Sequence, residues 1–94
     1  MAKVMTKNSN FAGRLRAVLL DGLSLAGLAS PKIEVERVPG TRLNRVTVLS
    51  KGFKELHHSE RQDLVWRIVG SVFSRDEQLQ ISSIYTFSPE ELQG

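Results

Sequence analysis

The spacing of hydrophobic and polar residues changes along the chain, and each change predicts an element. The first spacing is helical: apolar residues recur three and four positions apart, at Phe11, Leu15, Val18, Leu19 and Leu25-Ala26. This helix is expected to begin after the capping residues Asn8-Ser9-Asn10. It closes at residues 28–31, because Pro31 disfavours a helical conformation in the residue before it.

A strand pattern follows. Residues 32–38 alternate strictly between apolar and charged side chains, with Ile33 and Val35 opposed to Glu34 and Glu36. Pro39-Gly40 marks a turn, and residues 43–49 are apolar and β-branched enough for a second strand. The short connection predicts an antiparallel hairpin.

The strongest helical pattern lies further on, in an apolar stripe made by Leu64, Val65, Ile68, Val69, Val72 and Phe73. Ser59-Glu60-Arg61-Gln62 has the form of a capping box, in which Ser59 accepts from the first free amides and Gln62 reaches back. Trp66 lies off the centre of the stripe. It is predicted to be a boundary residue with its indole N–H in water rather than a ligand platform.

The last third of the chain predicts a strand and a short helix. Residues 74–77 are interpreted as a polar connector. Residues 79–87 form the third strand, with Leu79, Ile81, Ser83, Tyr85 and Phe87 on one face and Gln80, Ser82, Ile84 and Thr86 on the other. Ser88 caps the final helix, Pro89 suits its first position, and Glu91 completes a capping box.

These elements predict an α+β fold in the order α-β-β-α-β-α. Each long helix has one apolar stripe, and a sheet supplies the complementary surface, so we expect a three-stranded mixed sheet with helices packed on one face. Residues 10–94 are expected to form a single domain behind a flexible tail, residues 1–9.

The composition narrows the class of protein. The chain has 94 residues, of which 40% are hydrophobic and 24% charged, as in ordinary soluble domains. It contains no cysteine, which excludes disulfides, thiol catalysis and cysteine-ligated metals supplied by this chain alone. No segment has the pattern of a signal peptide or a membrane span, so the expected location is the cytoplasm, without membrane contact.

Charge is divided along the chain, which has a formal net charge of +3. From Arg37 to Lys54 the sequence contains no acidic residue and five basic ones, Arg37, Arg42, Arg45, Lys51 and Lys54. The segment from Asp76 to Gly94 contains four acidic residues and no basic one. The basic hairpin is either a solvated rim or a contact surface for nucleic acid.

Residues suited to catalysis are few. His57 and His58 are adjacent, so their side chains diverge and are poorly placed to chelate one metal; a surface loop or a helix start explains them better than a ligand role. The chain lacks a glycine-rich phosphate loop, a nucleophile elbow and a complete GXXG nucleic-acid clamp. We therefore predict a protein that is not an enzyme.

Several local matches occur in one order. Ser50 and Phe53 follow the second predicted strand, Arg61-Gln62-Asp63 comes eight residues after Phe53, and Leu64-Val65 opens the long helix. The chain closes with residues 84–91, Ile-Tyr-Thr-Phe-Ser-Pro-Glu-Glu. In this order, over roughly residues 11–92, the sequence resembles the BolA family, whose fold is similar to a class II KH domain.

The resemblance implies a partner, a monothiol glutaredoxin, and a role in iron–sulfur cluster handling or iron and redox regulation. In some members it implies DNA binding as a regulator. The sequence departs from the family at three places: Tyr85 stands where a histidine ligates a shared 2Fe–2S cluster, residues 39–44 lack a second ligand, and Gln62-Asp63 replaces His-Arg.

Three hypotheses follow. The first is a BolA-like interaction protein, monomeric or weakly homodimeric, that carries no cofactor by itself and partners a glutaredoxin. Its motif residues are Phe53, Arg61 and Tyr85, with His57 and His58 as weak metal candidates. The second is a KH-like nucleic-acid binder that uses the basic hairpin. The third is a diverged relative that binds another protein through its sheet edge or a helix groove.

Overall fold

The computed structural model describes residues 10–93. The predicted tail, residues 1–9, lies outside the described residues together with the predicted capping residues Asn8 and Ser9 that it contains, and so does Gly94. The elements follow in the order α2 (Asn10–Leu25), β1 (Lys32–Arg37), β2 (Asn44–Leu49), η1 (Lys51–Glu55), α3 (His58–Val72), α4 (Arg75–Gln78), β3 (Ile81–Phe87) and α5 (Pro89–Gln93). The predicted order is present, with η1 and α4 added to it.

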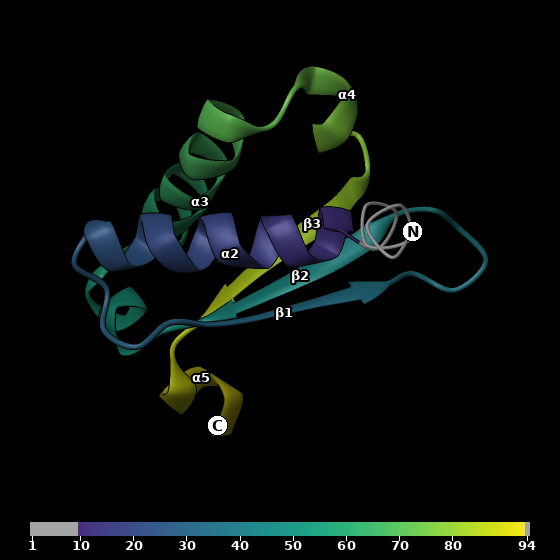
Figure 1. Cartoon of the computed structure of the whole chain (residues 1–94). Helices are drawn as coiled ribbons and strands as arrows, with labels where there is room; N and C mark the ends of the chain where they lie inside the picture. Colours follow the sequence, from purple (N-terminus) through teal and green to yellow (C-terminus); the bar gives the residue numbers. More distant parts are fainter. Residues whose placement is uncertain (1–9, 94) are drawn as a thin grey trace.

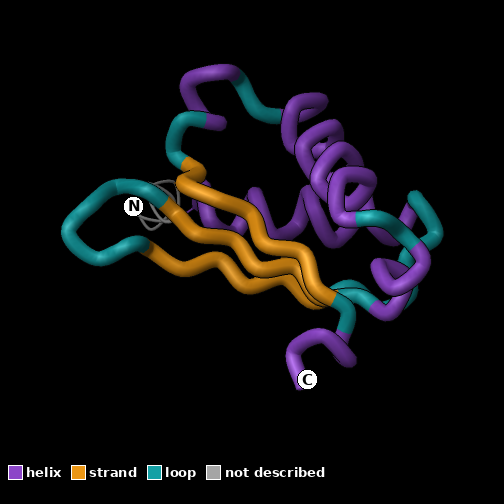
Figure 2. The backbone as a smooth tube through the Cα atoms, turned by 180° about the vertical axis from the view of Figure 1, so that it is seen from behind, coloured by secondary structure: helices purple, strands orange, loops and turns teal. Residues whose placement is uncertain are grey.

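The three strands form one mixed sheet in the order β1-β2-β3. β1 and β2 are antiparallel, as the short turn predicted, and β2 and β3 are parallel. Helices α2 and α3 cover one face of the sheet, while α5 extends beyond the end of β3 (Figure 1, Figure 2). The predicted α+β fold with helices on one face is confirmed.

Helix α2 buries a stripe that differs in part from the predicted one. Leu15, Leu19 and Leu23 are fully buried, whereas Leu25 is 83% exposed. The expected place of Leu25-Ala26 in the stripe was wrong. Leu23 lies four residues after Leu19 and shares its buried face, whereas Leu25 lies two residues further on and faces outward. Gly27, at a φ of +90°, turns the chain after the helix.

Helix α3 begins earlier than predicted. His57 is the residue before its first turn, and the backbone N–H of His57 donates to Glu60 Oε1 at 2.8 Å. The capping box therefore uses Glu60, and the predicted box of Ser59 and Gln62 was wrong. At the other end Val72 is 53% exposed, contrary to its predicted place in the stripe, because the helix ends there and Phe73 turns inward.

The sequence has no clear periodic pattern at the two short elements η1 and α4. Ser50 caps η1, since its Oγ accepts from the N–H of Gly52 at 3.2 Å and donates to the carbonyl of Ala29 at 3.0 Å. The predicted polar connector, residues 74–77, is wrong: it contains most of α4. Ser74 Oγ there accepts from the N–H of Glu77 at 3.2 Å, and Glu77 Oε1 accepts from the N–H of Ser74 at 2.9 Å.

Strand β3 contains an irregularity that changes which face its side chains occupy. Asn44 pairs with Ile81, but Arg45 pairs with Ser83, so Ser82 is an extra residue. Ile81, Ile84 and Thr86 consequently share the buried side. The predicted uninterrupted alternation over residues 79–87 was wrong for this reason.

One hydrophobic core joins the sheet to α2, η1 and α3. Phe53 of η1 is fully buried within it. The backbone of η1 packs closely on Leu28, since a Cβ added at Gly52 would collide with Leu28 Cδ2. In the part of the chain that the structure describes, every helix is too short or too polar to cross a membrane.

Candidate interaction site

The face of the sheet opposite α2 and α3 carries an aromatic pair, the exposed Tyr85 and the partly buried Phe87. Tyr85 and Phe87 alternate along β3 past the irregularity at Ser82, and their ring centroids lie 6.4 Å apart with planes 20° from parallel. Tyr85 is 45% exposed. Across the parallel pairing Thr47 lies opposite Tyr85, and Leu49 lies opposite Phe87. The two strands thus present adjoining rows of aromatic and apolar side chains.

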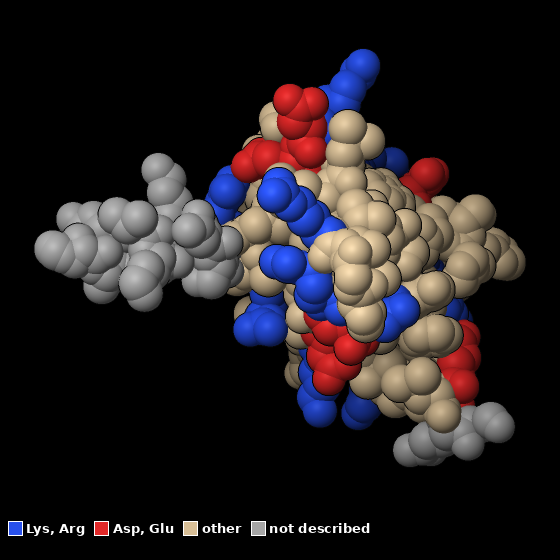
Figure 3. Space-filling model, turned by 90° about the vertical axis from the view of Figure 1, so that its right-hand side faces the viewer, with Lys and Arg blue, Asp and Glu red and all other residues tan. Residues whose placement is uncertain are grey.

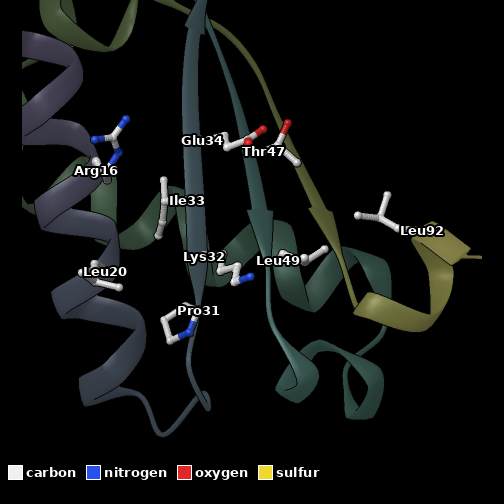
Figure 4. Close-up of a pocket in the computed structure, with 9 residues that line it drawn as sticks. All are labelled: Arg16, Leu20, Pro31, Lys32, Ile33, Glu34, Thr47, Leu49 and Leu92. Carbon is white, nitrogen blue, oxygen red and sulfur yellow. The ribbon is translucent and has the colours of Figure 1, made fainter.

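The last helix extends this surface. Leu92 of α5 is 55% exposed and lines the same groove as Thr47 and Leu49, on the side of β1 away from α2 (Figure 4). We call the set of Thr47, Leu49, Tyr85, Phe87 and Leu92 the open-face patch. Exposed apolar residues gathered in this way, with aromatic side chains among them, are typical of surfaces that bind another protein.

Arg61 holds α5 in the position that creates this patch. The residue is 6% exposed, and its guanidinium donates to both carboxylate oxygens of Glu91, at 2.8 and 2.9 Å. It also donates to the carbonyls of Leu56 at 3.1 Å and Thr86 at 3.3 Å, and it lies 5.6 Å from the ring centroid of Phe53. One side chain of α3 therefore ties together η1, β3 and α5.

This contact changes the ionisation of both partners. Hydrogen bonds from Arg61 and from the backbone N–H of Ser88 lower the pKa of Glu91 to about 2. The hydrogen bonds to Glu91 in turn raise the pKa of Arg61. The pair is charged at every physiological pH. The predicted role of Glu91 in completing the helix cap is confirmed by its bond to the Ser88 N–H at 2.9 Å.

Gln62, beside Arg61, binds the outer edge of β3. Its Nε2 donates to the carbonyl of Ile84 at 2.9 Å, and its Oε1 accepts from the indole N–H of Trp66 at 3.2 Å. Trp66 is half-buried, as expected of a boundary residue. The expectation that its N–H faces water was wrong, because Gln62 accepts from it.

His57 and His58 are both exposed at the start of α3. They border a groove that is otherwise lined by Leu56, Arg61, Thr86, Phe87 and Glu91. Within residues 10–93, no three or more His, Cys, Asp or Glu side chains are grouped closely enough to hold a metal ion.

The surroundings of Tyr85 do not fit a cluster-ligating site. Its neighbours on the open face are Ser83 and Phe87 along β3 and Thr47 across from it, and a phenol, hydroxyls and a benzene ring replace the thiolate and imidazole ligands of such clusters. The two histidines lie instead on the groove beside Arg61.

The five basic residues predicted as a contact surface fall into two separate groups. Arg37, Arg42 and Arg45 lie at the turn end of the hairpin, and Lys51 and Lys54 lie in η1, past the other end of β2. Arg45 pairs with Glu36 at 3.5 Å, and Lys54 pairs with Glu90 at 3.1 Å. The end view of the molecule shows Lys and Arg side chains interspersed with acidic ones (Figure 3).

The structure places the three motif residues in different environments. Phe53 and Arg61 are buried and act inside the fold, whereas Tyr85 is exposed on the open face. Sequence reasoning did not single out Leu49, Phe87 and Leu92 as surface residues. For Phe87 the signal was the alternation along β3, which the extra residue Ser82 shifts by one position.

The fold corresponds to the BolA-like class of α+β folds. Solved structures with this fold include BolA1 from Arabidopsis thaliana, with a TM-score of 0.60, 23% sequence identity, and coverage of 87% of this chain and 95% of that one. A bol-like protein from Babesia bovis matches with a TM-score of 0.51 and 17% identity, over 83% of this chain and 88% of that one.

These likenesses confirm the BolA-like fold that the sequence resemblance predicted. No protein-family model matches the chain, and no curated protein matches it in sequence.

Proposed function

We propose that this chain is a cytoplasmic, non-enzymatic member of the BolA family that binds a protein partner through the open-face patch. The observation that carries the proposal is the exposed Tyr85, stacked on the partly buried Phe87, together with the exposed Leu92 of α5, in a domain with a BolA-like fold. Tyrosine and other aromatic side chains are enriched where proteins bind each other, because they bury much area at a small cost in conformational entropy.

The partner class that the fold suggests is a monothiol glutaredoxin, in iron–sulfur or redox regulation. In this proposal the chain contributes contact surface to that complex, and Tyr85 contributes no ligand to a 2Fe–2S cluster. The support for this second part is chemical: hydroxyl and aromatic side chains surround Tyr85 on the open face.

The test uses the purified chain mixed with a monothiol glutaredoxin, both without a cluster and loaded with one. We expect a complex on gel filtration in both states and an unchanged visible spectrum of the loaded cluster. Tyr85→Ala is expected to weaken the complex at least about tenfold, as for an aromatic contact residue. Val72→Ala, which trims an apolar side chain exposed on α3, is the matched control and should leave the affinity unchanged.

The outcomes separate the two parts of the proposal. Absence of a complex in both states would remove the glutaredoxin as partner. A complex whose cluster spectrum changes would contradict the statement on ligands, and His57→Asn with His58→Asn would then show whether the imidazoles are responsible. Tyr85→His supplies an imidazole at the family's ligand position and is expected to change the spectrum where the wild-type chain does not.

The alternative is nucleic-acid binding at the turn end of the hairpin. It is favoured by one observation: Arg37 and Arg42 are exposed there and form no ion pair within residues 10–93. Arg45, which pairs with Glu36, is not counted with them. Two cations on the phosphate backbone should make binding to duplex DNA weaken with salt at a log–log slope of about −1.8, from about −0.9 for each phosphate neutralised.

A retardation assay at several salt concentrations tests this alternative. Arg37→Ala with Arg42→Ala should abolish most of the binding, whereas Lys51→Ala with Lys54→Ala, at the far end of β2, should preserve it. Equal losses in the two double variants would mean that the hairpin end is not a distinct site.

A further inference from the structure

Strand β1 forms an edge of the sheet, and its outward backbone groups have no hydrogen-bond partner within residues 10–93. The N–H of Val38 donates to Leu43 at 2.9 Å, so the backbone of Val38 points toward β2. The β1–β2 register is continuous, and successive residues of a strand point their backbone groups to opposite sides. The N–H and C=O groups of Ile33 and Val35 therefore point outward, as does the carbonyl of Pro31.

The opposite edge of the sheet does not share this property. Outward carbonyls of β3, those of Ile84 and Thr86, accept from Gln62 and Arg61. No side chain within residues 10–93 donates to or accepts from the backbone of Ile33 or Val35. One edge is closed by α3, and the other keeps its pairing capacity.

A groove crosses the open edge at the level of Ile33. Leu20, which is 44% exposed, and Ile33 lie on the helix side, while Lys32 and Glu34 lie on the open side (Figure 4). The groove thus combines free backbone groups with an apolar strip beneath them. A strand added to this edge would cover both at once.

We propose that a second copy of this chain occupies the edge, with the two β1 strands antiparallel and centred on Ile33. In this register Ile33 pairs with the partner's Ile33, and its N–H donates to the carbonyl of its counterpart. The N–H of Val35 donates to the carbonyl of the partner's Pro31. Four backbone hydrogen bonds result, because a two-fold axis repeats each contact.

Charge supports this occupant and this register. On the open side Lys32 lies opposite the partner's Glu34, and Glu34 lies opposite the partner's Lys32, so both cross-strand pairs are attractive. On the helix side Leu20 of each copy approaches the axis. A register shifted by two residues, centred on Glu34, would instead place Glu34 against the partner's Glu34. The alternation of Lys32 and Glu34 is self-complementary in one register.

The dimer would extend the mixed sheet to six strands, with the two open-face patches on the same side. Because β1 lies at the opposite edge from β3, pairing through β1 leaves Tyr85 and Phe87 accessible. This inference is independent of the partner proposed above: it concerns how many copies are joined, whatever binds the open face.

The experiment is sedimentation equilibrium of the full chain over a range of concentrations. The wild-type chain is expected to show a concentration-dependent monomer–dimer equilibrium. Lys32→Glu and Glu34→Lys should each weaken the dimer by about tenfold or more, because two like-charged pairs replace two attractive ones. The double variant carrying both changes exchanges the charges and should restore dimerisation to within about threefold of the wild type.

Glu36→Lys is the matched control. It makes the same charge change on the same face of β1, but in this register residue 36 faces Ser30 of the partner and not a charged side chain. It should leave the dimer unchanged. Circular dichroism of each variant confirms that the monomer is folded.

Three results would overturn the inference. The first is a wild-type chain that stays monomeric at millimolar concentration. The second is a double charge exchange that fails to restore a dimer lost in both single variants. The third is a dimer that is sensitive to Glu36→Lys and insensitive to Glu34→Lys, which would assign a different register.

Discussion

The two edges of the sheet meet their surroundings in different ways. Along β3, Arg61 and Gln62 of α3 donate to the carbonyls of Thr86 and Ile84, and Trp66 donates to Gln62 in turn. Along β1, alternating charged side chains flank an uncovered backbone. Both devices protect an edge strand from unwanted pairing, but the first does so permanently and the second only against partners whose charges do not match.

This contrast suggests that the two edges have different roles, one in stability and one in binding. The β3 edge belongs to the interior, since its caps also hold α5 and the open-face patch in place. The β1 edge contributes little to the interior and remains available for pairing. Changes on the β3 side should therefore alter stability strongly, and changes on the β1 side should alter it little.

The largest effect is expected for Arg61→Met, which keeps an apolar stem and removes the guanidinium. The carbonyls of Leu56 and Thr86 lose their donor, and Glu91 loses its partner. We expect the free energy of unfolding to fall by about 2–4 kcal/mol, measured by urea denaturation. Arg67→Met, at an exposed position on the same helix, is the control and should change it by less than about 0.5 kcal/mol.

Gln62→Leu tests the second side chain of α3 that bonds to the β3 edge. It leaves the carbonyl of Ile84 and the indole N–H of Trp66 without their partner, so we expect a loss of about 1–2 kcal/mol in the free energy of unfolding. Gln62→Glu separates the two bonds, because a carboxylate still accepts from Trp66 but cannot donate to Ile84. Trp66 fluorescence should then shift in the leucine variant only. Unchanged stability in both variants would contradict the role of Gln62.

A smaller effect follows from the pKa of Glu91, which is lowered to about 2 from an ordinary value of 4.5. The folded state favours the ionised carboxylate. Its contribution to stability is therefore complete above about pH 5 and is lost as the pH falls toward 2. Glu91→Gln should lose less stability than the wild type between about pH 5 and pH 2.5, as measured by urea denaturation midpoints.

Glu90→Gln is the control for this pH dependence, because it changes the neighbouring carboxylate, which pairs with Lys54 in solvent. Its acid sensitivity should follow that of the wild type. Identical pH profiles for Glu91→Gln and the wild type would mean that the contact between Arg61 and Glu91 does not stabilise the folded state.

The smallest effect is expected on the β1 side, for Glu36→Ala. The ion pair of Glu36 with Arg45 spans 3.5 Å, with the two side chains 67% and 38% exposed. Exposed pairs contribute little to stability, so thermal denaturation should show a change below about 0.5 kcal/mol. A loss comparable to that of Gln62→Leu would erase the proposed difference between the two edges.

The sequence predicted the layout of the fold because most of its elements have a clear period. The strict alternation around Ile33 and the stripe around Val65 and Val69 decided the hairpin and α3, and the order of local motifs indicated the BolA-like fold. The helix starts were less predictable: Ser59-Glu60-Arg61-Gln62 and His57-His58-Ser59-Glu60 offer competing caps, and local sequence alone does not choose between them.

The candidate site was harder to predict than the fold. Gln62 looked like the loss of a family residue, and only its position over the β3 edge shows that it binds Ile84 and Trp66. The five basic residues looked like one set along the chain. In space a strand separates Arg42 from Lys54, because β2 runs between them.

The extra residue in β3 has a consequence for how this surface can change over time. Ile81 faces inward before the extra residue, and Ile84 and Thr86 face inward after it. In an uninterrupted strand that begins with Ile81 inward, Ile84 and Thr86 would face outward. Pairing without this irregularity would set Ser82 against Arg45, so that Tyr85 and Phe87 would enter the core and Ile84 would leave it. Loss of Ser82, by contrast, would place Ser83 directly after Ile81 and keep Ile84 and Thr86 inward, with Tyr85 and Phe87 on the open face. The strand can therefore lose this one residue without exchanging core and surface, and substitutions can adjust the open face one side chain at a time.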